Sequence, residues 1–334
     1  MQNTQNQQDS QTMQISRIKP AIQAYFSSYV TLQDRVIFAL MLITGLLGIA
    51  LIALNHFHFH YTVPPWNFLR LLAFGQAFLV FIFWGMYVRK ESPRSSTFLW
   101  GLGIYFWTYL AVTTLTQGVQ GTPFRPIDSH LVKADFWFHV NTPALMAWTH
   151  AHAFIYKVFY QVYYSLIYEL IIIPVIFICF NGRRALTIFF IAVLATFIVG
   201  AMVYYFFPTT APSGVFHSHY FSKQQNATSL AFFNVHHRIT VTETDGGLIA
   251  FPSFHVIWAI ILTYCCKSKK YFFYPLVIYN LILMTATVFL GWHYLMDVFG
   301  AGIISWIGIY IAEKIVVREK SDLPISQSSA ADVF

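Results

Sequence analysis

Charged residues are scarce in this sequence. They make up 10% of the chain, whereas hydrophobic residues make up 57%; soluble domains carry about 25% charged residues. A soluble globular domain is therefore excluded, and the composition predicts an integral membrane protein with several spans. The basic residues stand in short clusters between apolar runs, so we attribute the net charge of +7 to membrane topology and expect no nucleic-acid partner.

Cysteine is also scarce. The three cysteines, Cys179, Cys265 and Cys266, lie at the ends of apolar runs, and none has the Cys-x-x-Cys spacing of a metal site. Residues 1–16 are rich in Gln and Asn and lead into no cleavable signal peptide. We therefore expect a disordered N-terminal tail, followed by a first membrane helix that acts as an uncleaved insertion signal.

Long apolar runs dominate the rest of the chain. A helix of about 18–25 apolar residues crosses the hydrocarbon core of a bilayer. The candidate spans are approximately 36–54, 67–88, 98–116, 156–180, 185–207, 253–266, 272–290 and 298–317. The run at 253–266 is short, so it can span only if its ends lie in the interfaces or if the helix begins in a protein-lined cavity. The expected fold is an all-α integral membrane protein with about eight transmembrane helices.

The basic residues predict how these spans are oriented. If the N-terminus is cytoplasmic, most of the 20 lysines and arginines fall in short cytoplasmic segments, as the positive-inside rule requires. An even number of spans then places both termini in the cytoplasm. The 13 histidines fall on the other face, together with two long loops at about 117–155 and 208–250. Within the first loop, residues 127–140 predict an amphipathic helix in the interface, with Leu131, Phe136 and Phe138 among its apolar residues.

Two short histidine motifs are the strongest candidates for chemistry. Residues 250–255 read Ala-Phe-Pro-Ser-Phe-His, and residues 291–297 read Gly-Trp-His-Tyr-Leu-Met-Asp. Two apolar runs joined by Lys267-Ser268-Lys269-Lys270 separate them, so the chain leaves and returns to the same membrane face. We therefore expect His255 and His293 to lie at one depth.

The spacing within each motif favours a particular role. His293 and Asp297 are four residues apart, so their side chains can meet on one helix face. A carboxylate on Nδ1 would fix the tautomer and leave Nε2 free as a nucleophile; the alternative is a pair that only caps a helix. Ser253 is placed to cap a helix whose free N–H groups would favour a phosphate beside His255. The alternative for His255 is an interfacial histidine near a helix end.

These motifs resemble a known family. Phe-Pro-Ser-x-His followed by His-Tyr-x-x-Asp is similar to the type 2 phosphatidic acid phosphatase superfamily, and most similar to its inositol phosphorylceramide synthase branch. The resemblance implies a six-helix core at 98–317, preceded by two additional helices at 33–97 and flanked by disordered cytoplasmic tails at 1–32 and 318–334.

The resemblance also implies roles for three residues. His293 would be the nucleophile that takes up the phosphoryl group, Asp297 would orient it, and His255 would protonate the leaving alcohol. The family uses no metal, and we expect no cofactor, which agrees with the lack of an obvious carboxylate cluster on the outer face.

The chain departs from the hydrolase branch of that family at two cations. That branch carries Lys-x6-Arg-Pro before the first histidine motif, but here Arg125-Pro126 lies two spans too early and Gly118 stands at the lysine position. The Ser-Arg pair before the second histidine is replaced by Ala286-Thr287. The synthase branch also lacks that arginine, and it resembles this chain in a Pro-Thr-x-x-Pro-like turn containing Thr209 and Thr210.

Phosphoryl transfer still needs a group that offsets charge on the phosphoryl oxygens. Arg238 is the first candidate, because it lies in the loop that leads into the first motif together with His236 and His237. We predict that Arg238, His237 and Ser253 bind the substrate phosphate. Arg125 and Lys157 are weaker candidates, and both are alternatively interfacial anchors.

Three further features of the sequence each allow two interpretations. Alternating histidines at 56–60 predict either a metal site on a strand or an interfacial segment. The tyrosine-rich stretch 156–168 predicts either a lipid-binding groove or an aromatic belt. Glu169 is an acid within a span, which favours a functional role, although it could instead pair with a tyrosine hydroxyl.

Together these observations predict a membrane lipid phosphotransferase that works through a phosphohistidine. Its partners would be a phospholipid donor and a lipid or polyol alcohol acceptor, with the active site facing the periplasm, a lumen or the exterior. One alternative is a lipid phosphate phosphatase, which would need only water as acceptor. A second is a lipid transporter or scramblase that uses the histidines as a proton relay. The sequence carries no signal for the oligomeric state.

Overall fold

The computed structural model describes residues 29–61, 68–180, 182–237, 239 and 250–322. Within these ranges every regular element is helical, which confirms the all-α prediction. The elements are α2 (Leu32–Leu54), η1 (Asn55–Phe59), α3 (Phe68–Tyr87), α4 (Pro93–Gln120), α5 (Asp128–Trp137), α6 (Thr142–Ala151), α7 (Ala153–Tyr164), α8 (Leu166–Cys179), α9 (Arg183–Phe206), η2 (Pro212–Gly214), α10 (Lys223–His236), α11 (Phe254–Cys265), α12 (Lys270–Phe289) and α13 (Leu295–Asp322).

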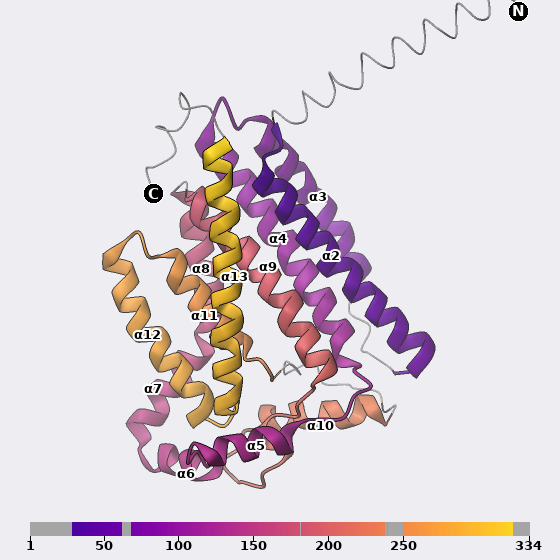
Figure 1. Cartoon of the computed structure of the whole chain (residues 1–334), viewed down its shortest axis with the longest axis vertical. Helices are drawn as coiled ribbons and strands as arrows, with labels where there is room; N and C mark the ends of the chain where they lie inside the picture. The colour runs from indigo at the N-terminus through magenta and orange to yellow at the C-terminus, as the bar shows by residue number, and fades with distance from the viewer. Residues whose placement is uncertain (1–28, 62–67, 181, 238, 240–249, 323–334) are drawn as a thin grey trace, which may run out of the picture.

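The long helices run side by side, and α5, α6 and α10 cross one end of the bundle (Figure 1). Helix α9 lies at the centre and packs against α13, α4, α2 and α11. Its side chains Phe190 and Leu194 are fully buried, as expected for a helix that is apolar all round. The core of the bundle is therefore built around α9, and the helices that carry the histidine motifs pack directly on it.

Several of these helices are consistent with a multi-pass membrane protein. Among the described residues, five helices are long and apolar enough to span, or six if α7 and α8, which are bent by 47° at Ser165, form one span. Helix α11 has 12 residues and covers only about 18 Å of the roughly 30 Å of hydrocarbon. Its first residues, Phe254 and His255, line a cavity. A start in a protein-lined cavity is one of the two conditions under which so short a run can span. The total of about eight spans stays a prediction.

Basic residues converge at the end of the bundle opposite α5, α6 and α10. The first described turn of α2 and the last described turn of α13 lie at the same end (Figure 1). Two buried or half-buried carboxylates each bind two of these cations: Asp34 binds Arg89 (2.7 Å) and Arg183 (3.2 Å), and Glu313 binds Arg184 (2.7 Å) and Lys267 (2.6 Å). This grouping agrees with the predicted clustering of basic residues on one face.

The loop helix predicted at 127–140 forms, but its orientation differs from the amphipathic pattern. Helix α5 buries Asp128 and Asp135 together with Leu131, whereas Phe136 and Phe138 are 48% and 51% exposed. The inward face is therefore largely polar. The two carboxylates accept hydrogen bonds from other segments, whereas Phe136 and Phe138 face away from the protein.

Glycine allows α2 to approach α4 closely. A Cβ atom at Gly48 would lie 2.7 Å from backbone atoms of Thr114 and Leu115, and one at Gly118 would lie 2.8 Å from the carbonyl oxygen of Gly48. Small residues at such crossings permit tight helix packing within membranes. Because Thr116 of α4 lines the cavity described below, this contact supports one wall of the candidate site.

We predict that Gly48→Val destabilises the bundle by about 1–3 kcal/mol, because the added side chain must separate two backbones. Gly45→Val is the matched control on the same helix, since no atom lies within 4 Å of the Cβ position there. Thermal unfolding of both variants in detergent measures the difference. Equal melting temperatures for the two variants would show that the α2–α4 crossing is not tight.

Candidate active site

The second motif forms the turn between α12 and α13. Gly291 adopts a φ of 74°, in the left-handed region that glycine enters without strain. The backbone N–H groups of Trp292 and His293 then both donate to the carbonyl oxygen of Thr287, at 3.0 and 3.1 Å. This turn places His293 at the end of the helix pair with its ring directed into the protein.

The ring of His293 is held at one nitrogen. Nδ1 lies 2.9 Å from the carbonyl oxygen of Ala250 and 3.2 Å from Oδ2 of Asp297. Both partners are acceptors, so Nδ1 carries the proton and Nε2 keeps its lone pair. Asp297 is fully buried and its Oδ2 also accepts from the N–H of Tyr294 at 2.9 Å. The predicted contact between His293 and Asp297 is therefore present, with a backbone carbonyl as an additional partner.

Burial controls the charge of this ring. Removal from water lowers the pKa of His293 to about 4, and the hydrogen bond with the Ala250 carbonyl offsets only part of that effect. The imidazole is therefore neutral at neutral pH, which is the form that can act as a nucleophile at Nε2.

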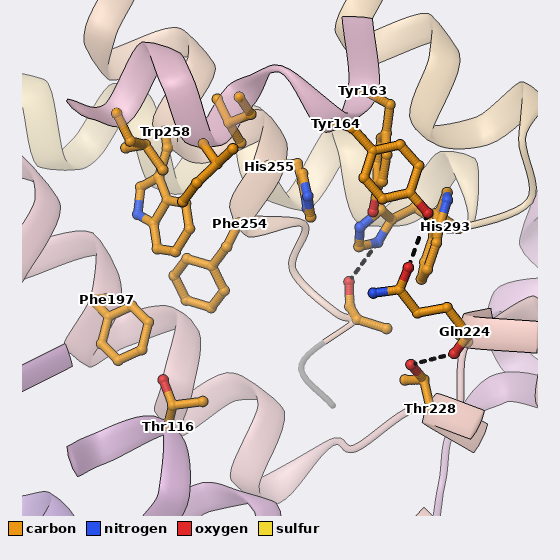
Figure 2. A pocket seen from close by; sticks show the side chains of 16 residues that line it. Thr116, Tyr163, Tyr164, Phe197, Gln224, Thr228, Phe254, His255, Trp258 and His293 are labelled. Carbon is orange, nitrogen blue, oxygen red and sulfur yellow. Dashed lines mark hydrogen bonds between the residues drawn. The ribbon is translucent and has the colours of Figure 1, made fainter. Parts of the chain in front are cut away.

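The first motif begins α11 as predicted. Ser253 is the N-cap, and its hydroxyl oxygen accepts from the N–H of Val256 at 3.5 Å. The N–H of Ser253 donates to the carbonyl oxygen of Asp297 at 3.3 Å, which joins the start of α11 to the start of α13. As a result the rings of His255 and His293 lie close together (Figure 2), and their centroids are 5.9 Å apart.

Both histidines line a cavity of about 360 Å³. Aromatic rings form much of its wall: Tyr163 stacks on His255 at 4.4 Å on one side and on Trp292 at 5.3 Å on the other. The hydroxyl of Tyr164 donates to Oε1 of Gln224 at 3.0 Å (Figure 2). This arrangement links α7 and α10 to the histidine motifs and gives the cavity a largely apolar interior with a few polar groups.

Helix α5 contributes two carboxylates that the sequence reasoning did not single out. Asp135 accepts from the N–H groups of Leu295 (2.9 Å) and Met296 (3.2 Å), and so caps α13. Asp128 accepts from the hydroxyl of Tyr294 at 3.0 Å and from the N–H of Thr210. Burial raises the pKa of both carboxyls, and these hydrogen bonds offset part of the rise. The sequence does contain a signal for this pair: a spacing of seven residues on one helix puts both acids on the same face.

Neither of the predicted phosphate-binding residues that the structure describes lines the cavity. Ser253 is fully buried at the start of α11. His237 is exposed at the C-terminal end of α10, where its Nδ1 contacts the carbonyl oxygen of its own helix at 2.8 Å, and it does not line the cavity. Arg238 lies outside the described residues. Arg125 and Lys157 are exposed, and no lysine or arginine is found among the described residues that line the cavity.

The other candidate residues from the sequence lie in different parts of the structure. Two tyrosines of the stretch 156–168, Tyr163 and Tyr164, line the cavity, whereas Tyr168 is 64% exposed. Glu169 accepts a hydrogen bond from Asn280 at 3.1 Å rather than from a tyrosine. His56 and His58 lie within the helical turn η1, and His60 is its C-terminal cap, so this segment is not the strand that a metal site there would need. Across the described ranges, no three metal-ligating side chains come together.

A family comparison agrees with this site. A model described as the PAP2 superfamily matches residues 129–311, which is more than half of the chain. The chain belongs to the PAP2 superfamily. The match extends from α5 to α13 and includes both histidine motifs and Asp135, and it points to no particular branch. No curated protein and no solved structure matches the chain. Membership in the PAP2 superfamily supports a phosphatase or phosphotransferase type of function on lipids.

We predict that Asp135→Ala lowers the free energy of unfolding by about 0.5–2 kcal/mol, because two N–H groups at the start of α13 lose their acceptor. Asp135→Asn keeps an acceptor oxygen and should lose less. Thermal unfolding of the purified protein measures both changes. Lys133→Ala, an exposed position on the same helix, is the control, and a loss of equal size there would contradict the capping role.

Proposed function

We propose that the protein is a membrane lipid phosphotransferase that works through a phosphohistidine. The observation that supports this most directly is the ring of His293, whose Nδ1 is occupied by two acceptors while the ring lines a cavity shared with His255. A neutral imidazole held in this way presents Nε2 to a substrate without needing to rotate.

The proposed reaction has two steps. In the first, Nε2 of His293 attacks the phosphorus of a lipid phosphodiester; an N–P bond forms, the P–O bond to the leaving alcohol breaks, and the protonated form of His255 gives a proton to that oxygen and becomes neutral. In the second, an acceptor alcohol attacks the phosphorus, its proton passes to His255, and the N–P bond breaks. Both imidazoles line the same cavity, with their ring centroids 5.9 Å apart, so each could contact a phosphoryl group bound in that cavity.

Head-group transfer is favoured over hydrolysis within this proposal. The sequence lacks both cations that characterise the hydrolase branch, and no lysine or arginine is found among the described residues that line the cavity. Aromatic walls favour a lipid acceptor over bulk water. The reaction we favour is similar to that of inositol phosphorylceramide synthases, with a phospholipid donor and a lipid or polyol acceptor.

We place this reaction on the non-cytoplasmic face. Gln224 and Thr228 of α10 line the cavity, and α10 crosses one end of the bundle, whereas the helix ends that carry the cations paired with Asp34 and Glu313 lie at the opposite end (Figure 1). Basic residues mark the cytoplasmic side of membrane proteins, so this arrangement supports an active site that faces the periplasm, a lumen or the exterior.

A donor–acceptor panel tests the proposal. Purified protein in detergent receives fluorescent phosphatidic acid, phosphatidylinositol and ceramide, each alone and in pairs, and the products are separated by chromatography. A new phospholipid that forms only when donor and acceptor are both present supports the transferase. Release of free phosphate from phosphatidic acid alone would show that the protein is a phosphatase and not a transferase. Lipid movement across vesicles without any phosphoryl transfer would favour the transporter.

In the same assay, His293→Gln should lower turnover by about a thousandfold or more, because the nucleophile is lost. Size-exclusion chromatography and thermal unfolding establish that the variant is folded. His130→Gln is the matched control, since His130 is exposed on the outside of α5. Turnover by folded His293→Gln at the wild-type rate would rule out a phosphohistidine at this position.

The rate of phosphohistidine formation should not fall between about pH 7 and about pH 5, because His293 stays neutral and protonation of His255, which supplies the leaving-group proton, can only raise the rate. The pKa of about 4 keeps His293 neutral over this interval, whereas an ordinary histidine would gain a proton near pH 6.5. Single-turnover labelling with a phosphodiester donor measures the rate, because the donor phosphate does not titrate there. A loss of rate centred near pH 6.5 would show that His293 is not held neutral by burial.

The same shift affects stability, so folding must be checked at each pH. Between about pH 6.5 and about pH 4 the unfolded chain binds a proton at His293 that the folded protein excludes. The contribution of this residue to folding therefore becomes less favourable as the pH falls. Rates are compared only for samples that elute as folded protein.

A further inference from the structure

A second cavity lies at the end of the bundle opposite the histidines. It has a volume of about 420 Å³ and is formed where α8 and α11 end and where α9 and α12 begin. Its walls are mostly apolar, with Phe177 and Ile188 inside and Phe180 and Phe272 toward the surface. Phe180 and Phe272 are 59% and 66% exposed, so this cavity opens as a groove on the outer surface of the bundle.

Cations surround the mouth of this groove. Arg184, Lys267 and Lys269 are among its lining residues, and the lining contains no acidic side chain. Glu313 behind them binds both Arg184 and Lys267, at 2.7 and 2.6 Å. One carboxylate between two cations leaves a net positive charge. The side chains of Arg184 and Lys267 are 32% and 35% exposed and so remain accessible from outside.

An apolar groove beneath a cationic mouth matches one class of molecule. We propose that this groove binds an anionic phospholipid as a second lipid site, separate from the cavity of the two histidines. The head-group phosphate would lie against Arg184, Lys267 and Lys269, and an acyl chain would lie between Phe180 and Phe272. Anionic lipids are attracted to basic residues at the membrane surface, and long cationic side chains reach the head groups from helix ends.

The two lipid sites lie at opposite ends of one helix. Helix α11 begins at the wall of the first cavity with Phe254 and His255 and ends at the second with Cys265. The 12 residues between these ends cover about 18 Å, so one head group cannot occupy both. Substitutions at the second groove therefore report on binding there without touching the candidate catalytic residues.

Native mass spectrometry of the full chain tests this proposal. Protein carrying His293→Gln, which prevents turnover, is mixed with phosphatidylglycerol or with phosphatidylcholine of the same acyl chains. We expect selective retention of phosphatidylglycerol, which decreases about fivefold for each cation removed in Arg184→Gln and Lys269→Gln. Ala185→Trp fills the groove and should displace the lipid while leaving every cation in place.

Arg94→Gln is the matched control, because Arg94 is an exposed cation at the start of α4 and does not line the groove. Equal retention of the two lipids by the unsubstituted groove would overturn the proposal. So would wild-type retention in folded Ala185→Trp, or an equal loss in Arg94→Gln, which would indicate general surface attraction. If Arg184→Gln fails to fold because Glu313 loses a partner, Lys269→Gln and Ala185→Trp decide the question.

Discussion

The hydrogen bonds at Nδ1 of His293 are the constraint on which the candidate site depends. To bring the carbonyl oxygen of Ala250 and Oδ2 of Asp297 to one nitrogen, the chain before α11 must meet the first turn of α13. The bond from the Ser253 N–H to the Asp297 carbonyl makes the same connection through the backbone. The position of one imidazole therefore requires that both motifs, far apart in sequence, be assembled together.

The donors that bind the carboxylates around this assembly carry no charge among the described residues. Asp128, Asp135 and Asp297 are all buried, and the donors that bind them are backbone N–H groups, the Tyr294 hydroxyl and the His293 ring. Such neutral donors offset only part of the cost of burial, and Oδ1 of Asp297 has no hydrogen-bond partner among the described residues. The acids thus fix the geometry of the turn at Tyr294, and the charge in the cavity depends on the histidines and on the substrate.

Local spacing made part of this site predictable. The Ser253 cap forms as the sequence indicated. His293 and Asp297 also meet, although His293 lies in the turn before α13 and not on the helix that the four-residue interval suggested. The all-helical fold followed equally from the apolar runs. Asp128 and Asp135 could not be assigned the same way, because their donors lie more than 80 residues away in the chain. The break of α7 and α8 at Ser165 and the position of Tyr163 between two rings likewise depend on packing that no local pattern encodes.

The short length of α11 has a consequence for how a lipid would reach the histidines. A helix of 12 residues covers about 18 Å, about 12 Å less than the full hydrocarbon thickness. The floor of the cavity is therefore recessed, and Ile167, which lines it, is also 56% exposed on the flank of the bundle. A donor lipid that approaches from this flank would keep its acyl chains in the bilayer while only its head group enters, so extraction from the membrane would not contribute to the barrier.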